Sequence, residues 1–172
     1  MVFYFGYGSN MSKQYLENIR GIFPIRSRPT KLLDYELIMN LKGPNFIEPS
    51  FANIRYKTGS KVEGIVHEVS QNELDRIVAS EGETYELINE QVELDGSKVD
   101  SVTLRSTEEL SIEVPASRRY MDILIRAAVE NGFSEEYIGM LKAKKSVYYP
   151  VLSEVYAIRL YLWVKKRAKL LP

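Results

Sequence analysis

The sequence predicts a mixed α+β domain in which most strands come first and most helices come last. The strand-like segments lack the regular alternation with helices that builds a Rossmann sheet, and this order favours non-local strands that could form a small barrel. With 172 residues, the chain has the length of one domain with a sizeable core. Neither a repeat nor a linker divides it.

The first half of the chain contains one short helix among several strand signals. Residues 11–20 are predicted to be helical, because Gly21 follows them as a helix-ending residue. A turn signal at Thr58-Gly59 separates the last two strands of this half. The strands are expected over residues 1–4, 22–28, 32–41, 51–56 and 62–69.

The second half begins with a helix over residues 71–80, for which Ser70 is a suitable N-cap. Asp95-Gly96 is typical of a hairpin turn and joins two further strands. Two more helices follow, and an apolar, aromatic tail ends the chain. These elements are expected over residues 85–94 and 99–105 for the hairpin, 115–131 and 134–142 for the helices, and 151–171 for the tail.

The composition excludes several classes of function. Lys+Arg and Asp+Glu both number 23, so no overall field attracts nucleic acid or an anionic membrane. The absence of cysteine excludes thiol nucleophiles, disulfides and thiolate metal sites. The single histidine, His67, lies on an alternating strand, where we expect a solvent-facing rather than a catalytic side chain. The N-terminus lacks a signal-peptide pattern, so a cytoplasmic location is expected.

The most informative motif is Tyr7-Gly8-Ser9-Asn10, which follows a β-prone run and which we call the N-terminal turn. A glycine turn at a strand end can direct several backbone N–H groups at one point. Such a point suits a carboxylate or a developing oxyanion. The alternative is an ordinary connection from strand to helix that binds no ligand.

Acid–base chemistry in this chain falls to a carboxylate, a lysine or a tyrosine. Glu81 follows the predicted helix 71–80, and a carboxylate at the C-terminal end of a helix faces an unfavourable dipole. If Glu81 is also partly buried, it suits a general base that later acts as an acid. The alternative is that Glu81 is solvated, like its neighbour Glu83.

Five segments, in the right order and spacing, resemble the γ-glutamylcyclotransferase family, which includes AIG2-like proteins. The resemblance runs from residue 2 to about residue 143. It predicts a γ-glutamylcyclotransferase-like domain over residues 1–143 and a helical extension over residues 144–172, packed on the domain or on a partner. The matching segments are residues 5–10, 33–37, 51–54 with 62–66, Leu74-Asp75 with Glu81-Gly82, and 115–120 with Gly132 and Tyr137.

The resemblance implies a closed or nearly closed β-barrel with surrounding helices and no metal or organic cofactor. It also implies an enzyme that releases 5-oxoproline from a small γ-glutamyl amide, by attack of the substrate's own α-amino group on its γ-carbonyl. Glu81 would be the general acid/base, and the N-terminal turn would hold the glutamyl group. Tyr120 would line the pocket and bind substrate, or else simply pack as a buried tyrosine on its helix.

Departures from the family pattern leave the leaving amine open. Gly6 stands where the family usually has alanine, and Ala116 replaces a proline. The gap between Glu81 and Tyr85 is short, which suggests a small loop on the acceptor side. An alternative is therefore a γ-glutamylamine cyclotransferase that acts on an isopeptide or a biosynthetic intermediate.

The apolar tail motivates two further alternatives. The domain could be a non-catalytic ligand-binding or interaction module. The tail is too short and too charged to span a membrane, and we expect it to pack on its own domain or on a second copy in a homodimer. The other interpretation is an interfacial membrane helix, with basic side chains on lipid headgroups. Those basic residues are Lys165, Lys166, Arg167 and Lys169.

Overall fold

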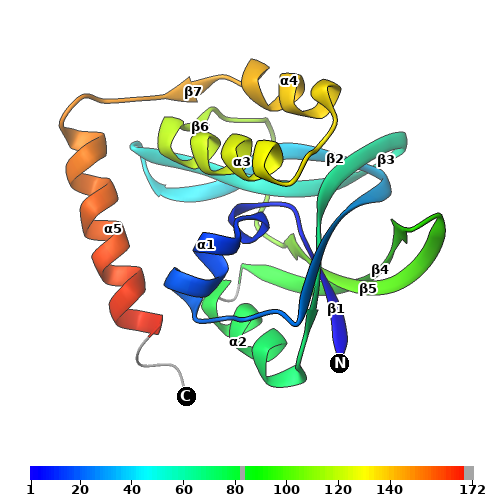
Figure 1. The fold of residues 1–172 in the computed structure, drawn as a ribbon. Helices are drawn as coiled ribbons and strands as arrows, with labels where there is room; N and C mark the ends of the chain where they lie inside the picture. Colours follow the sequence, from blue (N-terminus) through cyan, green and yellow to red (C-terminus); the bar gives the residue numbers. More distant parts are fainter. Residues whose placement is uncertain (82–83, 169–172) are drawn as a thin grey trace.

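Five strands close into a barrel in the computed structural model, which describes residues 1–81 and 84–168, with side chains up to Trp163 (Figure 1). The strand order is β1-β3-β2-β4-β5, and a parallel pairing of β5 with β1 closes a barrel whose other pairs are antiparallel. The predicted α+β class and barrel are confirmed. The strands are β1 (Val2–Gly6), β2 (Arg26–Asn45), β3 (Glu48–Val69), β4 (Tyr85–Leu94) and β5 (Ser97–Ser106).

Helices surround one end and one side of this barrel (Figure 1). The predicted N-terminal helix is broken into three short turns, which end as expected at Gly21 in the left-handed conformation (φ 64°). A separate two-stranded parallel sheet pairs β6 (Ala116–Ser117), which precedes α3, with β7 (Ser146–Val147), which follows α4. The helical segments are η1 (Ser9–Met11), α1 (Lys13–Tyr15), η2 (Leu16–Arg20), α2 (Gln71–Glu81), α3 (Arg118–Glu130), α4 (Glu135–Ala143) and α5 (Leu152–Ala168).

The long strands β2 and β3 differ from the sequence prediction, which divided them into four. Thr58-Gly59 does not reverse the chain, because β3 continues through it. Instead the pairing register shifts between Leu33 and Tyr35, where Asp34 has a positive φ of 59° and accepts a hydrogen bond from the Gly59 N–H (2.8 Å). The glycine therefore supports a bulge that bends the two strands together.

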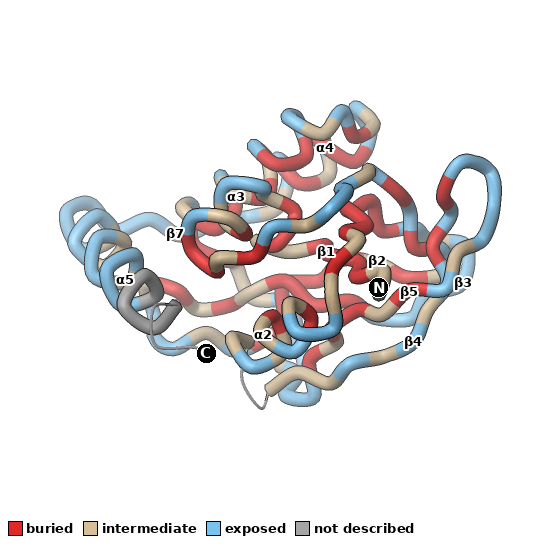
Figure 2. The backbone as a smooth tube through the Cα atoms, turned by 60° about the horizontal axis from the view of Figure 1, so that its bottom comes forward, coloured by how far each residue is buried: buried red, intermediate tan, exposed pale blue. Residues whose placement is uncertain are grey.

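Buried residues follow the barrel strands and the inner faces of α3 and α4, whereas α5 is mostly exposed (Figure 2). A second, smaller cluster joins β1, η2 and α2, and includes Tyr4, Leu16 and Ile77. It fixes the end of α2, and so Glu81, against the strand that leads into the N-terminal turn. Ile22, which we expected in a strand, is instead buried in this cluster.

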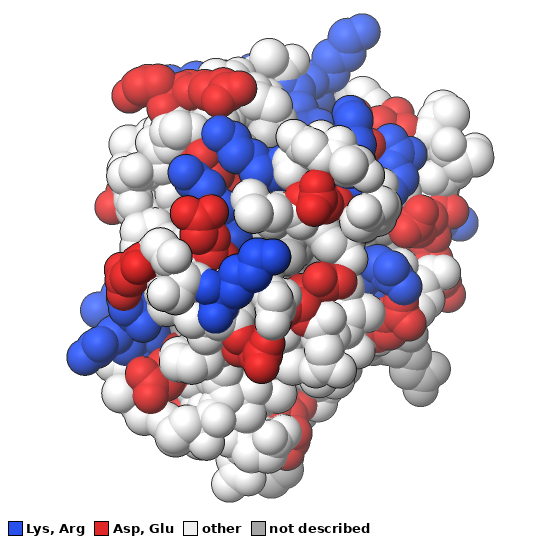
Figure 3. All heavy atoms as spheres, turned by 90° about the vertical axis from the view of Figure 1, so that its right-hand side faces the viewer, with Lys and Arg blue, Asp and Glu red and all other residues white. Residues whose placement is uncertain are grey.

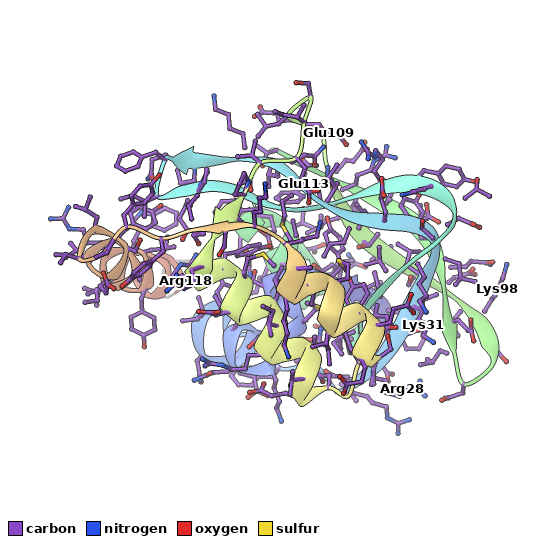
Figure 4. All side chains as sticks on the ribbon, turned by 90° about the horizontal axis from the view of Figure 1, so that it is seen from above. Arg28, Lys31, Lys98, Glu109, Glu113 and Arg118 are labelled. Carbon is purple, nitrogen blue, oxygen red and sulfur yellow. The ribbon has the colours of Figure 1, made fainter. Side chains whose placement is uncertain are left out.

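The segment between β5 and β6 lies against β2, at the level of Glu109 and Glu113 (Figure 4). Glu113 accepts a hydrogen bond from the Met39 N–H (3.0 Å), and Glu109 accepts one from Asn53 Nδ2 (3.1 Å). These contacts hold the segment that leads into α3. On the face drawn in Figure 3, acidic and basic side chains are interspersed, as the balanced composition predicts.

Candidate active site

A cavity of about 600 Å³ lies between the barrel, the N-terminal helical turns, α3 and α5, and its volume suits a small molecule. All six residues that the sequence singled out line it, although they come from three distant parts of the chain. They are Tyr7, Gly8, Ser9, Asn10, Glu81 and Tyr120.

The N-terminal turn leaves β1 at Gly6 and enters η1 at Ser9. Gly8 has a φ of −105°, so its glycine is not required by a left-handed backbone. A Cβ at Gly8 would lie 3.1 Å from Tyr120 Oη, so glycine avoids a tight contact at this position. A Cβ at Gly6 would lie 3.3 Å from atoms of Asn10, so this turn is tightly packed.

Glu81 ends α2, and both of its hydrogen bonds with the described residues fall on one oxygen. Oε1 accepts from Asn10 Nδ2 (3.0 Å) and from Arg20 Nη2 (2.5 Å). Oε2 accepts none from the described part of the chain, and the side chain remains 18% exposed. The carboxylate is thus anchored through one oxygen, while the other makes no hydrogen bond with the described residues.

The sequence did not identify Arg20, which forms this buried ion pair. Its guanidinium also contacts Ser80 Oγ and lies 5.3 Å from the centroid of the Tyr15 ring. Burial by itself lowers the pKa of Arg20. The charge of Glu81 is the largest of several opposing effects that outweigh burial, so the net shift of the pKa is upward. A basic residue just before a helix-ending glycine is usually explained by the helix dipole, so the sequence carried no stronger signal.

Asn10 connects the N-terminal turn to the barrel as well as to Glu81. Its Nδ2 also donates to Tyr4 Oη (2.9 Å), and its backbone oxygen lies 3.0 Å from His67 Nε2. A carbonyl oxygen only accepts, so Nε2 carries the proton and Nδ1 accepts from Ser27 Oγ (2.8 Å). His67 therefore helps to hold Asn10 in place.

The prediction of a solvent-facing His67 is wrong, because this side chain is only 1% exposed. Alternation along a strand separates two faces, but the closure of the barrel and the packing of η1 decide which of them is covered. Burial lowers the pKa of His67 to about 4, against a raising effect of its hydrogen bond to Asn10. The imidazole is consequently neutral near pH 7.

Buried phenols surround the carboxylate. Burial raises the pKa of Tyr7 and of Tyr120, so both stay neutral. Tyr7 Oη donates to the Leu104 carbonyl (2.6 Å), whereas Tyr120 Oη accepts from the Ala52 N–H (3.3 Å) and retains its own proton to donate. The sequence left two alternatives for Tyr120, a pocket-lining side chain or a buried tyrosine packed on its helix. Both describe it in part, since its ring packs on Phe51 and the residue also lines the cavity.

Helix α5 forms the other side of the cavity, which we call the α5 wall, and it lies beside η2 (Figure 1). Ahead of α5, the Tyr149 ring contacts Phe46 edge-on (5.3 Å between centroids), and Arg118 lies 4.3 Å from the centroid of the Tyr148 ring (Figure 4). The lining residues of the α5 wall are Tyr156, Arg159, Leu160 and Trp163.

The described residues contain no group of three or more His, Asp or Glu side chains arranged to hold a metal ion. No helix within the described ranges is both long and apolar enough to cross a membrane. The basic side chains at 165–167 and 169, on which the interfacial interpretation of the tail depends, lie outside the described side chains.

Comparisons of the sequence give two matches. A model of the AIG2-like family matches residues 61–141, a span that contains Glu81 and Tyr120 but begins after the N-terminal turn. A curated relative, the γ-glutamyl cyclotransferase aclK of Aspergillus oryzae, is 26% identical over 174 residues and is matched by 87% of this chain. This chain spans 63% of the length of that relative.

Solved structures share the fold. A γ-glutamyl cyclotransferase superposes with a TM-score of 0.73 at 24% identity, over 87% of this chain and 90% of that one. The human protein loc79017 superposes with a TM-score of 0.72 at 23% identity, over 86% of this chain and 90% of that one. YkqA from Bacillus subtilis superposes with a TM-score of 0.65 at 21% identity, over 85% of this chain and 56% of that one. The family match and the curated relative agree in supporting a γ-glutamylcyclotransferase-like protein of the AIG2-like family, and the solved structures share its fold.

Proposed function

We propose that this protein is a γ-glutamylcyclotransferase-type enzyme that releases 5-oxoproline from a γ-glutamyl amide. One observation carries the proposal: Glu81 and the N-terminal turn are hydrogen-bonded in one cavity, through Asn10 Nδ2 and Glu81 Oε1 at 3.0 Å. A carboxylate beside a helical turn, whose first N–H groups have no partner within the turn, can supply a base and an oxyanion site together.

The reaction needs no nucleophile from the protein. Glu81 Oε2 takes a proton from the substrate α-ammonium, and the freed amine attacks the γ-carbonyl carbon to close a five-membered ring. The bond from that carbon to the amide nitrogen then breaks, and Glu81 returns the proton to the leaving nitrogen. Because the attack is intramolecular, much of the task is to hold one conformer of the substrate.

The N-terminal turn is suited to the γ-carbonyl oxygen. The first N–H groups of a helical turn have no partner within that turn, and in η1 they belong to residues of the cavity lining. They can donate to the oxygen as its negative charge develops. The Tyr120 hydroxyl, which keeps its proton, is a further donor at the same end of the cavity.

The γ-glutamylamine alternative is supported by the α5 wall. Tyr156, Leu160 and Trp163 present apolar surface to the cavity, and Pro44 and Phe51 add to it from the β2–β3 hairpin. Such a wall favours a leaving amine with an apolar body. Both candidates share the chemistry and differ only in the amine that leaves.

The test is to incubate the protein with a panel of γ-glutamyl amides and to quantify 5-oxoproline. The panel pairs γ-glutamyl amino acids with γ-glutamyl amines of the same side chain, and the ratio of their kcat/KM values separates the two candidates. N-acetyl-γ-glutamyl amides are the control, because they lack the nucleophilic amine and should give no product. Folded protein that releases no 5-oxoproline from any amide would support a non-catalytic binding module instead.

A further inference from the structure

We propose that Arg20 is a positioning residue for Glu81: it holds one carboxylate oxygen in place, so that the other oxygen faces the substrate ammonium. The inference rests on the proposed function, because it assigns Arg20 a role in presenting the base.

The guanidinium of Arg20 is fixed on several sides. Its side chain is 8% exposed, its Nη2 lies 2.5 Å from Glu81 Oε1, and its Nη1 hydrogen-bonds to Ser80 Oγ. Ser80 Oγ in turn donates to the Ile77 carbonyl (2.7 Å) inside α2. The Arg20 side chain therefore hydrogen-bonds to the last two residues of α2.

The pairing geometry differs from that of a purely structural ion pair. A guanidinium commonly binds both oxygens of a carboxylate in parallel. Arg20 instead binds Oε1 of Glu81 and places its second nitrogen on Ser80, while Asn10 occupies the same Oε1. The three contacts orient the carboxylate and leave Oε2 unused among the described residues.

Arg20 is also the cation that forms an ion pair with Glu81 among the described residues. The other titratable groups that interact with this carboxylate are phenols on β1, on the N-terminal turn, on β4 and on α3. Burial raises the pKa of each of them, so they are neutral at physiological pH and cannot stabilise the anion by charge. They are Tyr4, Tyr7, Tyr85 and Tyr120.

A matched control is present in the same contact between η2 and α2. Arg76, on α2, donates to the carbonyls of Arg20 and Gly21 (both 3.3 Å) and so joins the same two elements. It makes no hydrogen bond or ion pair with Glu81 in the described structure. Arg76→Met should weaken the packing of η2 on α2 without changing the environment of the carboxylate.

The experiment compares the pH dependence of kcat/KM for the wild type, Arg20→Met, Arg20→Lys and Arg76→Met. Removal of a cation within hydrogen-bonding distance of a carboxylate should move the acidic limb of the Arg20→Met profile to higher pH, by about one to three units. Arg20→Lys keeps the charge but loses the two guanidinium nitrogens that bind Glu81 and Ser80. This variant should keep the acidic limb of the pH profile near its wild-type position and should lower kcat. Arg76→Met should lower the melting temperature while its limb stays in place.

An acidic limb that is unchanged in folded Arg20→Met would overturn the inference, and so would an equal shift in Arg76→Met. A wild type that forms no 5-oxoproline would refute the proposed function instead. The pairing can then still be tested by NMR, from the pH titration of the Glu81 carboxyl carbon in wild type and Arg20→Lys, which retains the charge, and in Arg20→Met. If Arg20→Met does not fold, Arg20→Gln replaces it, with the same expected shift to higher pH.

Discussion

The two sides of the cavity are built in opposite ways. At the Glu81 end, formed by Asn10, Arg20, Ser80 and Glu81, each of the four side chains makes at least one hydrogen bond to another part of the site or to a packed helix, and the supporting His67 is buried. On α5, which forms the other wall, apolar side chains remain in solvent: Ile158 is 61% exposed and Leu162 is 59% exposed (Figure 2).

This difference suggests how the chain divides its tasks. A general base and an oxyanion site tolerate little displacement, so they belong on elements whose positions are fixed by many contacts. In the proposed reaction, the side of the cavity that receives the leaving amine needs only the right size and polarity. We therefore expect changes at the Glu81 end to affect the rate of chemistry, and changes in the α5 wall to affect the choice of substrate.

The largest effect is expected from Glu81→Gln, which removes the proposed base. We expect kcat/KM to fall by about 10²- to 10⁴-fold. The variant also leaves the buried guanidinium of Arg20 without its counter-charge, which can cost about 3–5 kcal/mol of stability. Melting curves must therefore accompany the kinetics, with Asp75→Asn, on the exposed face of α2, as the control. A folded Glu81→Gln protein with wild-type activity would contradict the mechanism.

The second prediction concerns the pH dependence of stability at the Glu81 end. His67 has a pKa of about 4 in the folded protein and an ordinary value of 6.5, so the unfolded chain takes up the proton first as the pH falls. The free energy of unfolding should decrease from about pH 6.5 downward and lose about 3 kcal/mol by pH 4.

Urea titrations at pH 7, 5.5 and 4.5 would measure this loss. Glu36 and Glu73 have lowered pKa values, so their contributions are lost only at lower pH, below about 4.5. His67→Gln removes the titrating group, and its stability should stay nearly constant over that range. A wild type whose stability is equal at pH 7 and pH 4.5 would show that His67 is not buried as described.

The third prediction compares two glycines. A Cβ at Gly64 would lie 2.5 Å from the Phe5 ring and 2.6 Å from the Gly6 oxygen, next to the N-terminal turn. Gly64→Ala should therefore cost about 1–3 kcal/mol and also reduce activity. Gly139, in the middle of α4, has open space around its Cβ position, so Gly139→Ala should be neutral or stabilising by up to about 1 kcal/mol. Chemical denaturation of both variants measures the difference, and equal values would contradict it.

The smallest effect is expected in the α5 wall. Tyr156→Ala and Leu160→Ala should lower kcat/KM for a bulky apolar leaving amine by about tenfold or less and leave a methylamide almost unchanged, because only contacts with the amine are lost. Leu162→Ala is the matched control, since Leu162 lies on α5 but outside the cavity lining. A similar loss for both amides would mean that α5 supports the Glu81 end rather than substrate choice.

Much of the fold could be predicted because its signals are local. The hairpin at Asp95-Gly96, the cap at Ser70 and the helix end at Gly21 all lie where turn chemistry requires them. Thr58-Gly59 was misinterpreted because a glycine with positive φ serves a bulge as well as a turn, and only pairing with Asp34 distinguishes the two. Likewise, alternation around His67 could not show which face of the strand is covered.

The sequence by itself determined the order of elements, the glycine turn after β1 and a carboxylate at the end of α2, since each of these depends on residues close together in the chain. Only the tertiary structure decided that Asn10, Arg20 and Glu81 meet, because closure of the barrel brings together residues up to 71 positions apart. It also decided that one oxygen of Glu81 is held and that the other makes no hydrogen bond with the described residues. That division follows from the directions of two side chains on different elements, which no local pattern records.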